Sequence, residues 1–386
     1  MALPLKYNFR NITVRKSSTL ATAFSIGLTV GVFLMVMALA RGIDLTLTSS
    51  GEPLNLIVLR EGSTAELNSS VTRENLNNLI YLDGIVREGD QPLVAPETLT
   101  LIYKARKGMS QGSNVTIRGI GAMSNKLRSG FKTVAGRMFQ PGLTEAIVSR
   151  RIAERFQGLD VGDKFRVQAT DYTVVGLFEA GGKAFESEIW VDVNSLASST
   201  KRESFSSVLL RAKDPTALAS LAKRITDDQA LHLKAVPERT FYEDQQGLSS
   251  VLKGLAVFIA LIMAIGAGFA GMNTMYAAVA RRTKEIGTLR VLGFRRRSIL
   301  IAFVLESVAI AVIGVGIGIL LALPLNFVST GTANFANFSE IAFNFRVTPE
   351  LMLWALIFGV GIGFLGSLLP SIRASRFRIV DALRSS

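Results

Sequence analysis

Residues 254–297 decide the fold, and they read GLAVFIALIMAIGAGFAGMNTMYAAVA followed by RRTKEIGTLRVLGFRRR. The first part, Gly254–Ala280, is 27 residues without a charge, and the second part, Arg281–Arg297, carries seven basic residues and one acidic residue. A helix needs about 20 apolar residues to cross the hydrocarbon core of a bilayer. Gly254–Ala280 is therefore predicted to be a membrane span, and Arg281–Arg297 is the segment that emerges from it.

Three other stretches have the same character. Leu20–Ala40 holds no charge, Ser298–Leu325 holds only Glu306, and Leu351–Leu369 is uncharged and ends at Pro370. Hydrophobic residues make up 49% of the 386-residue chain and charged residues 19%, which is too apolar for an ordinary soluble protein. The sequence predicts a membrane α-helical protein whose four spans lie at 20–42, 248–280, 298–325 and 351–370.

The basic charge is concentrated next to these runs. The formal net charge is +13, and the segments 1–19, 281–297 and 371–386 together carry 15 basic and two acidic residues, which accounts for all of it. Membrane proteins concentrate Lys and Arg in their cytoplasmic loops, whereas nucleic-acid-binding proteins spread them over a folded surface. Both termini and segment 281–297 are therefore predicted to be cytoplasmic, regions 43–247 and 326–350 external, and nucleic acid is not an expected partner.

The first apolar run has a competing interpretation as a cleavable signal peptide, because Ala38-Leu39-Ala40 closes it. Signal-peptide apolar cores run to about 7–15 residues and this run is longer, so a retained span is favoured. Ahead of it, Pro4–Lys16 places Leu5, Phe9 and Ile12 at helical spacing among basic residues. The cytoplasmic segment 1–19 is therefore predicted to hold an amphipathic helix on the membrane surface.

Region 43–247 is predicted to be an α+β domain with two lobes that meet near residue 200. The predicted strands are Leu54–Arg60, Thr98–Arg106, Asn114–Ile120, Phe165–Ala169, Thr173–Phe178, Glu188–Val193, Ser207–Arg211 and His232–Ala235. The predicted helices are Arg150–Phe156 and Pro215–Thr226, and the second would complete a βαβ unit between the last two strands. Asp44–Ser50 and Phe241–Lys253 are expected to extend the first two spans outward as a helical stalk.

Catalytic and metal sites have little support in the sequence. There is no Cys and only one His, so a Cys/His zinc site is excluded. That residue, His232, stands between Leu231 and Leu233 in a strand-like alternation and is predicted to be structural. Gly182-Lys183 resembles the end of a P-loop, but Leu177 and Ala184 occupy the positions that need Gly and Ser or Thr. Residues 266–271 and 361–366 match G-x-G-x-x-G inside spans, where small residues serve helix packing. The chain is not expected to hydrolyse ATP itself.

Segment 281–297 is the most informative part of the chain. If it is helical, one face carries apolar side chains and basic residues flank that face, namely Ile286, Leu289 and Leu292 beside Gly293, with Lys284 and Arg290. Such a short amphipathic helix between two spans could dock a cytoplasmic partner. An ordinary basic loop lying on anionic lipid is equally compatible with the pattern.

The same segment resembles the coupling motif of the MacB/FtsX superfamily of ABC permeases, R-T-x-E-I-G-x-x-R-x-x-G-x-x-x-x-x-I after the second span. The matching residues are Arg282, Thr283, Glu285, Ile286, Gly287, Arg290, Gly293 and Ile299. The C-terminal stretch is similar to the family's ending on Pro370, Arg373-Ala374 and Val380–Arg384, except that Ile379 replaces a proline. External stretches resemble the MacB-type periplasmic core domain at Gly136-Arg137, Phe139, Glu145–Val148, Gly162-Asp163, Val175-Gly176 and Phe178-Glu179.

The resemblance implies an exporter or extractor permease in the cytoplasmic membrane, similar to split members of the LolC/LolE or DevC type. ATP and magnesium would be bound by a separate ATPase, present in two copies, and this chain would bind no cofactor. A second permease copy, a periplasmic adaptor and membrane lipid are the other implied partners. The implied ATPase-coupling residues are Arg282, Thr283, Lys284, Glu285, Ile286, Gly287, Leu289, Arg290, Leu292 and Gly293.

The sequence leaves two alternative functions and the role of one residue, Glu306, undecided. One alternative is an FtsX-like transmitter that controls a cell-wall hydrolase. The other is a membrane enzyme or secondary transporter, although the internal repeats and broken spans of secondary transporters are not evident. Glu306 is the single charge inside a predicted span. It either snorkels or caps a neighbouring helix in a structural role, or it marks a functional site.

Overall fold

The computed structural model describes residues 16–245, 247–334 and 339–376, which divide into two compact units. The helical unit contains the described residues up to Gly42, Ser249–Val328, and those from Phe345 onward. The globular unit contains Ile43–Leu248 and Ser329–Asn344. The chain therefore crosses between the units four times, and the last two crossings flank a short segment between the third and fourth apolar helices.

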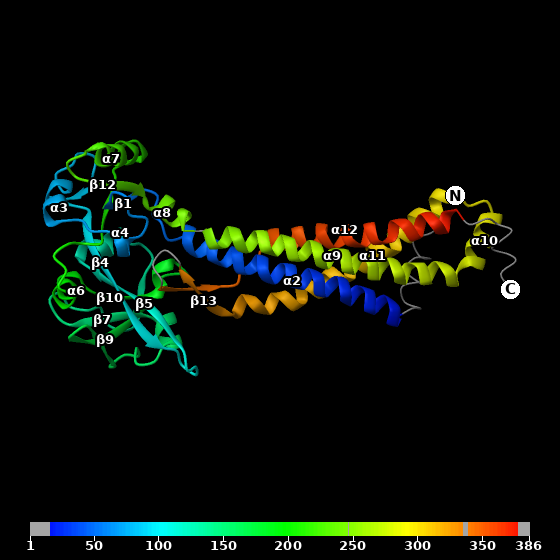
Figure 1. Cartoon of the computed structure of the whole chain (residues 1–386), viewed down its shortest axis with the longest axis horizontal. Helices are drawn as coiled ribbons and strands as arrows, with labels where there is room; N and C mark the ends of the chain where they lie inside the picture. The colour runs from blue at the N-terminus through cyan, green and yellow to red at the C-terminus, as the bar shows by residue number, and fades with distance from the viewer. Residues whose placement is uncertain (1–15, 246, 335–338, 377–386) are drawn as a thin grey trace. The chain divides into compact units, whose positions relative to one another are not determined.

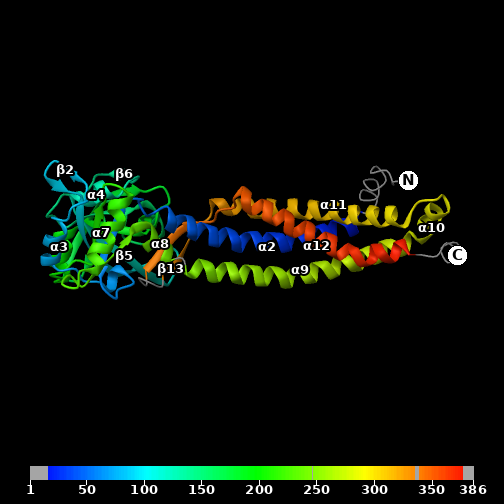
Figure 2. The ribbon, with the colours of Figure 1, turned by 90° about the horizontal axis from the view of Figure 1, so that it is seen from above.

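Four long helices form the helical unit (Figures 1 and 2), and they are α2 (Lys16–Thr48), α9 (Gly247–Arg281), α11 (Arg296–Ala322) and α12 (Pro349–Ser375). Within the described residues these four are long and apolar enough to cross a membrane. Lys16 is the first described residue of α2. The surface helix predicted over Pro4–Lys16 therefore lies outside the described residues except for Lys16, as does the C-terminal motif Val380–Arg384. The predicted stalk helix Phe241–Lys253 includes residue 246, which is also outside them.

Glycines allow three of these helices to approach closely. A Cβ added to Gly314 of α11 would lie 2.6 Å from the Ala23 carbonyl oxygen of α2, and one added to Gly318 would lie 2.7 Å from the Gly27 oxygen. In α12 a Cβ on Gly363 would lie 2.5 Å from the Ala311 side chain. The helix-packing role predicted for the second G-x-G-x-x-G stretch is thus confirmed at Gly363, because a larger residue would force the helices apart.

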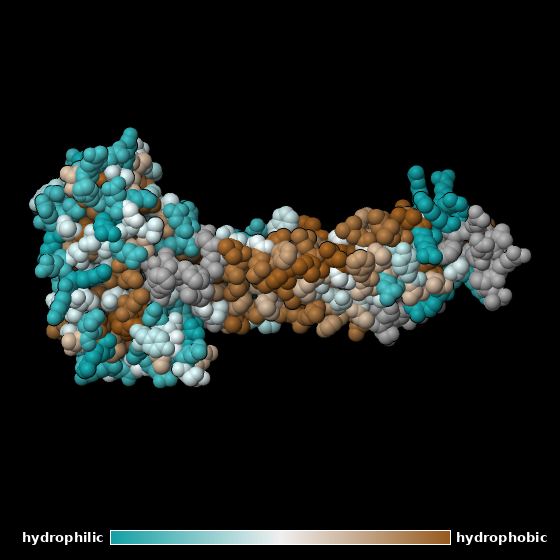
Figure 3. Space-filling model, viewed as in Figure 1, coloured by the Kyte–Doolittle hydropathy of each residue, from teal (hydrophilic) through white to brown (hydrophobic). Residues whose placement is uncertain are grey.

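Apolar side chains cover much of the outer surface of the helical unit (Figure 3). α9 is the least covered helix, and its Phe258, Ile265 and Phe269 are each more than 60% exposed. An apolar groove of about 460 Å³ runs between α9 and α12 and is lined by Phe269 and Leu365 among others. A surface this apolar needs lipid or another apolar surface as its neighbour.

A ten-stranded mixed sheet organises the globular unit, in the order β12-β1-β11-β4-β5-β10-β7-β9-β6 with β8 paired to β9. The strands are β1 (Asn55–Arg60), β4 (Val94–Ala105), β5 (Gly112–Ile120), β6 (Lys132–Gly136), β7 (Glu145–Ser149), β8 (Lys164–Val167), β9 (Thr170–Glu179), β10 (Glu188–Asp192), β11 (Ser207–Arg211) and β12 (Leu233–Pro237). The sheet carries the short helices α3 (Arg73–Leu79), α4 (Ala122–Leu127), α5 (Arg150–Arg155), α6 (Val193–Thr200), α7 (Pro215–Asp227) and α8 (Glu238–Asp244). The 3-10 turns are η1 (Glu66–Asn68) and η2 (Ala184–Ser187), and a small ribbon pairs β2 (Arg87–Glu88) with β3 (Gln91–Pro92).

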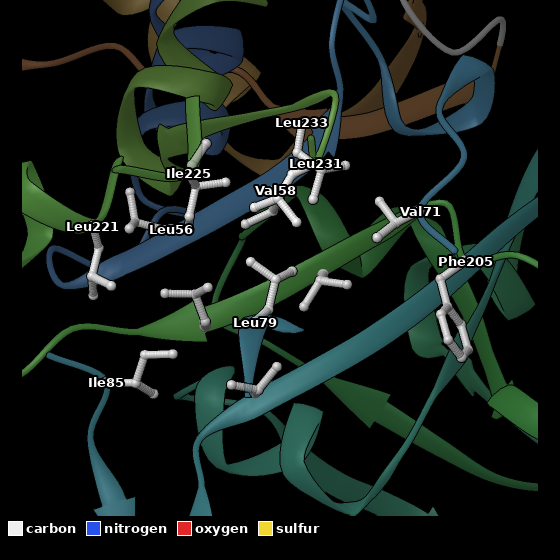
Figure 4. Packing of buried hydrophobic residues seen from close by; sticks show 14 of the residues in the cluster. Leu56, Val58, Val71, Leu79, Ile85, Phe205, Leu221, Ile225, Leu231 and Leu233 are labelled. Atoms are coloured by element: carbon white, nitrogen blue, oxygen red, sulfur yellow. The ribbon is translucent and has the colours of Figure 1, made fainter. Parts of the chain in front are cut away.

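The described residues of this unit form three hydrophobic cores, one on the β11 side of β4 and two on its β5 side, and β4 connects the two regions. Its first residues, Val94–Glu97, pair with β11, and its later residues, Thr98–Ala105, pair with β5. The first core packs α7 against β1, as Figure 4 shows for Ile225 and Leu56. The second core includes Val115 and Phe156, and the third includes the stacked aromatic side chains Phe178 and Trp190. We refer to the part around the first core as the first lobe and to the part around the other two as the second lobe.

The structure refines the predictions for this domain. All eight predicted strands are present, and β8 and β9 form the predicted hairpin. The predicted βαβ unit is split, because β1 lies between β11 and β12 and is antiparallel to both. The chain passes between lobes twice, within β4 and again after β10, so a boundary near residue 200 corresponds only to the second passage.

Two local predictions were wrong. His232 was assigned to a strand, but β12 begins at Leu233 and His232 has a φ of +48°, with a side chain 79% exposed beside Glu61. Region 326–350 was treated as a short loop, but it forms the 3-10 turn η3 (Leu323–Phe327) and the hairpin β13 (Ser329–Asn334) and β14 (Ser339–Asn344).

Candidate coupling segment

The segment between α9 and α11 folds as a separate short helix, α10 (Thr283–Val291). α9 ends at Arg281 because Arg282 leaves the helical conformation, with φ −106° and ψ 14°. The Thr283 hydroxyl donates a hydrogen bond of 2.8 Å to the Ala280 carbonyl oxygen, and the Ile286 amide continues the new helix by donating to the Arg282 carbonyl oxygen at 2.9 Å. α9 and α10 are therefore separated by a single non-helical residue, Arg282.

Ile286 anchors the inner side of α10. It is 2% exposed and belongs to a cluster with Met275 and Val279 of α9, Ile299 and Phe303 of α11, and Ala374 of α12. Gly287 beside it is also buried. Burial of an isoleucine side chain contributes about 1.5–3 kcal/mol, so displacement of α10 would disturb three long helices together.

A buried ion pair anchors the start of the segment. The Arg282 guanidinium lies 3.0 Å from the Glu306 carboxylate of α11, and the two side chains are only 5% and 8% exposed. Charged side chains inside a membrane segment are tolerated when they pair with each other. The structure therefore gives Glu306 a partner 24 positions earlier in the chain, and the alternatives of snorkelling and helix capping do not describe it.

Gly293 closes the segment in a left-handed turn. Its φ of +89° is a conformation that other residues adopt only with strain. The Gly293 amide donates to the Arg290 carbonyl oxygen, the Phe294 amide donates to the Leu289 carbonyl oxygen, and the Arg290 guanidinium donates to the Phe294 carbonyl oxygen. These bonds satisfy carbonyl groups at the end of α10 and direct the chain into α11.

The outer side of the segment is exposed. Val291 and Leu292 are 59% and 65% exposed, and Lys284 and Glu285 are also exposed. The prediction that Ile286, Leu289 and Leu292 share one face was therefore wrong, since Ile286 is buried, Leu289 half-buried and Leu292 exposed. An α-helix turns by about 100° per residue, so six residues bring the chain to about 120° from its starting direction.

The globular unit contains a second charged cluster, which the sequence gave no reason to expect. The Arg118 guanidinium of β5 holds Glu66, Glu97 and Glu188 at 2.7–2.8 Å, and these side chains are at most 10% exposed. Arg128 also pairs with Glu97, at 2.6 Å. Glu97 stands where β4 changes partner from β11 to β5, so the cluster lies at the junction of the two lobes.

Burial shifts the ionisation of this cluster in different directions. Burial alone would raise the pKa of Glu97, but the charges of Arg128 and Arg118 outweigh it and lower that pKa to about 2. Glu238 of α8 has a raised pKa, because burial outweighs the effect of Arg128 and of its hydrogen bonds with Glu52 and Asn55. Glu97 is therefore held as a carboxylate, while Glu238 is more readily protonated.

The described residues contain no group of three or more His, Cys, Asp or Glu side chains placed to hold a metal ion. The segment is a short helix that packs against the long helices on its inner side and is exposed on its outer side. The Arg282–Glu306 pair was missed from the sequence. Asking which cation neutralises an intramembrane Glu306 would have identified the neighbouring basic segment as its source.

Comparison with known proteins agrees with this architecture. The family model described as "MacB-like periplasmic core domain" matches residues 19–228, and the model described as "FtsX-like permease C-terminal" matches residues 257–379. The first match spans α2 and most of the globular unit, and the second spans α10, α11, α12 and most of α9. The chain belongs to the MacB/FtsX family of ABC transporter permeases.

The MacB/FtsX relatives differ in how much of their length is shared. The macrolide export ATP-binding/permease protein MacB of Brucella abortus is 27% identical over 59% of this chain, which spans only 36% of that protein. The uncharacterized ABC transporter permease YknZ of Bacillus subtilis is 26% identical over 97% of this chain and 96% of its own length. The crystal structure of the extracellular domain of YknZ from Gram-positive bacteria covers 47% of this chain at 18% identity, with a TM-score of 0.36.

Proposed function

We propose that this permease couples ATP hydrolysis on a separate ATPase subunit to movement of its globular domain outside the membrane. In this proposal two ATPase copies bind ATP and magnesium, and α10 receives their motion. The work exports or extracts an amphiphilic or periplasmic substrate. The chain acts as a dimer with a second permease copy or a related permease, together with an adaptor and lipid. It lies in the cytoplasmic membrane with both termini in the cytoplasm.

One observation carries the proposal, namely the two-sided character of α10. Ile286 and the Arg282–Glu306 pair fix its inner side to the long helices, while Val291 and Leu292 expose apolar surface beside a basic stretch. Exposed apolar residues next to charge are typical of a protein contact. Membrane lipid could also cover these exposed residues. A protein contact that transmits force is favoured because the other side of α10 is fixed firmly to the long helices.

The globular domain supports export over the FtsX-like alternative. The family model that matches it is that of a MacB-like periplasmic core domain. The C-terminal permease match does not separate the two candidates, because it concerns the helices and α10. The exposed face of α9 supports a second permease copy or bound lipid as its neighbour.

The test replaces Leu292 with arginine in the full chain, expressed with its ATPase and purified in mild detergent. Leu292 is 65% exposed, so the substitution leaves the fold intact while placing a charge in the proposed contact. Leu143→Arg is the matched control, since Leu143 is an exposed leucine of the globular unit. We expect Leu292→Arg to lose most of the co-purified ATPase and Leu143→Arg to keep it. Equal ATPase recovery for both variants would contradict the assignment of α10.

A further inference from the structure

The hairpin β13–β14 connects α11 and α12 in the sequence, yet it packs within the globular unit. Its strands pair over six residues, from Ser329↔Asn344 to Asn334↔Ser339. β14 packs against β5 and η2 of the second lobe. The hairpin is thus a link between the membrane helices and the globular domain that is separate from the chain connections of α2 and α9.

Glu340 of β14 fixes the hairpin to the second lobe. Its side chain is 1% exposed and lies between the guanidinium groups of Arg106, at the end of β4, and Arg155, at the end of α5. A buried carboxylate is stable only with such partners, so the pairing specifies where the hairpin docks. The Ala342 amide adds a second attachment by donating a 2.8 Å hydrogen bond to the Ser187 hydroxyl.

Gly331 of β13 lies over the same ion pair. A Cβ at this position would overlap both the Glu340 carboxylate and the Arg155 guanidinium. The opposite strand of the hairpin therefore covers the pair closely, which explains why Glu340 is shielded from water. Shielding strengthens the attraction between the charges because less solvent screens them.

The docked hairpin meets the charged cluster at the lobe junction. Glu340 and Ser339 line a cavity of about 30 Å³ together with Arg118 and with Tyr242 of α8. α8 directly precedes α9 in the chain. Glu238 of α8 also accepts a hydrogen bond from the Glu52 amide, in the segment that follows α2. All three segments of the globular unit that continue into membrane helices therefore converge on the junction between the lobes.

We propose that Glu340 is a coupling residue, which keeps the hairpin docked so that displacement of α11 and α12 moves the second lobe relative to the first. This inference rests on the proposed function. Arg106 and Arg155 belong to the second lobe, at the ends of β4 and α5, so a force on the hairpin acts on that lobe directly. Without the ion pair the helices could move while the globular domain stays in place.

The experiment compares hydrogen exchange of the globular domain in the permease–ATPase complex, with and without bound ATP. Wild type is expected to show ATP-dependent changes near the lobe junction, and Glu340→Ala is expected to lose at least two thirds of that difference while still binding the ATPase. Glu350→Ala is the matched control, because Glu350 forms an exposed 3.5 Å pair with Arg41 at the start of α12. It should behave as wild type.

A disulfide provides a second variant that does not depend on Glu340. Ser187→Cys with Ala342→Cys replaces the hydrogen bond between those residues with a covalent link, and the native chain has no Cys to interfere. In the Glu340→Ala background this link should restore the ATP-dependent difference, and a reductant should remove it again. If Glu340→Ala keeps the full difference, or if the disulfide does not restore it, the role of Glu340 is overturned. If wild type shows no ATP-dependent change at all, the proposed function itself fails.

Discussion

Replacing Arg118 with methionine should destabilise the globular domain strongly. The Arg118 side chain is 2% exposed and holds the carboxylates of Glu66, Glu97 and Glu188 at 2.7–2.8 Å. Methionine removes the charge and leaves those buried carboxylates without this cation. Removing one partner of a buried pair costs about 3–5 kcal/mol, which is a large part of the roughly 5–15 kcal/mol that stabilises a whole domain.

Trp190 provides the assay. It is fully buried, and its indole N–H donates a 2.9 Å hydrogen bond to Glu188 of the cluster. The chain has two tryptophans, so a Trp354→Phe background leaves Trp190 fluorescence as the reporter of domain unfolding. Urea titration of the full chain in detergent micelles would give the free energy of unfolding. The expected result is a loss of about 3–5 kcal/mol for Arg118→Met.

Arg166→Met is the matched control, since Arg166 is 69% exposed and pairs with Asp171 at 2.7 Å on the surface of the same domain. Exposed ion pairs contribute little to stability, so the urea midpoint of this variant should stay close to that of wild type. If Arg118→Met shifts the midpoint no further than Arg166→Met does, the buried cluster does not stabilise the domain and the reasoning is refuted.

Wild type and Arg118→Met should also differ in how their folding stability depends on pH below 4.5. The pKa of Glu97 is lowered to about 2 in the folded domain, against an ordinary value of 4.5. The stabilisation that Glu97 provides is therefore present above pH 4.5 and is lost as the pH falls from 4.5 to about 2, because the unfolded chain then binds the proton first. Arg118→Met removes one of the two cations responsible, so the stability gap between variant and wild type should narrow over that range. A gap that widens would contradict this account.

Two further predictions concern the helical unit and the topology. Gly359→Val should destabilise the helix packing by about 1–3 kcal/mol, because a Cβ there overlaps the Val315 side chain. Gly361→Val should be tolerated, because no atom lies within 4 Å of a Cβ at that position. Thermal unfolding in detergent compares the two variants, and equal melting temperatures would refute the packing argument. A single cysteine at exposed Asn68 should react with a membrane-impermeant thiol reagent in intact cells, and one at exposed Lys284 should not, because basic segments remain in the cytoplasm; labelling at Lys284 from outside would reverse the proposed orientation.

The sequence alone located features whose cause is local. Each long apolar run became a helix, since a stretch of about 20 apolar residues has few other stable forms in a protein of this composition. Runs such as Ser207–Arg211 and Glu188–Asp192 became strands with nearly the predicted bounds. The motif from Arg282 to Gly293 indicated the family but left a short helix and a basic loop equally open, and α10 (Thr283–Val291) occupies that segment.

Weak local patterns were less informative. β13 consists of small and polar residues and is a strand because it pairs with β14, whose Ala342 and Phe343 are buried in the globular unit. The exposure of Leu292 likewise depends on where α10 ends and turns at Gly293. In both places the local structure depends on contacts with neighbouring elements, and the local sequence pattern does not indicate those contacts.

Only the tertiary structure decided which charges meet. Arg282 pairs with Glu306, 24 positions away, and Glu340 pairs with Arg155 and Arg106, which lie far from it in the sequence but in the same globular unit. Arg118 gathers carboxylates from three separate elements. A hydrophobic span is specified by the composition of consecutive residues. The partner of a buried charge is instead set by the tertiary fold, because an unpaired charge is costly only once folding has buried it. The apolar runs therefore determined that the chain is a membrane protein, and the fold determined how its helices are tied to the domain they are proposed to move.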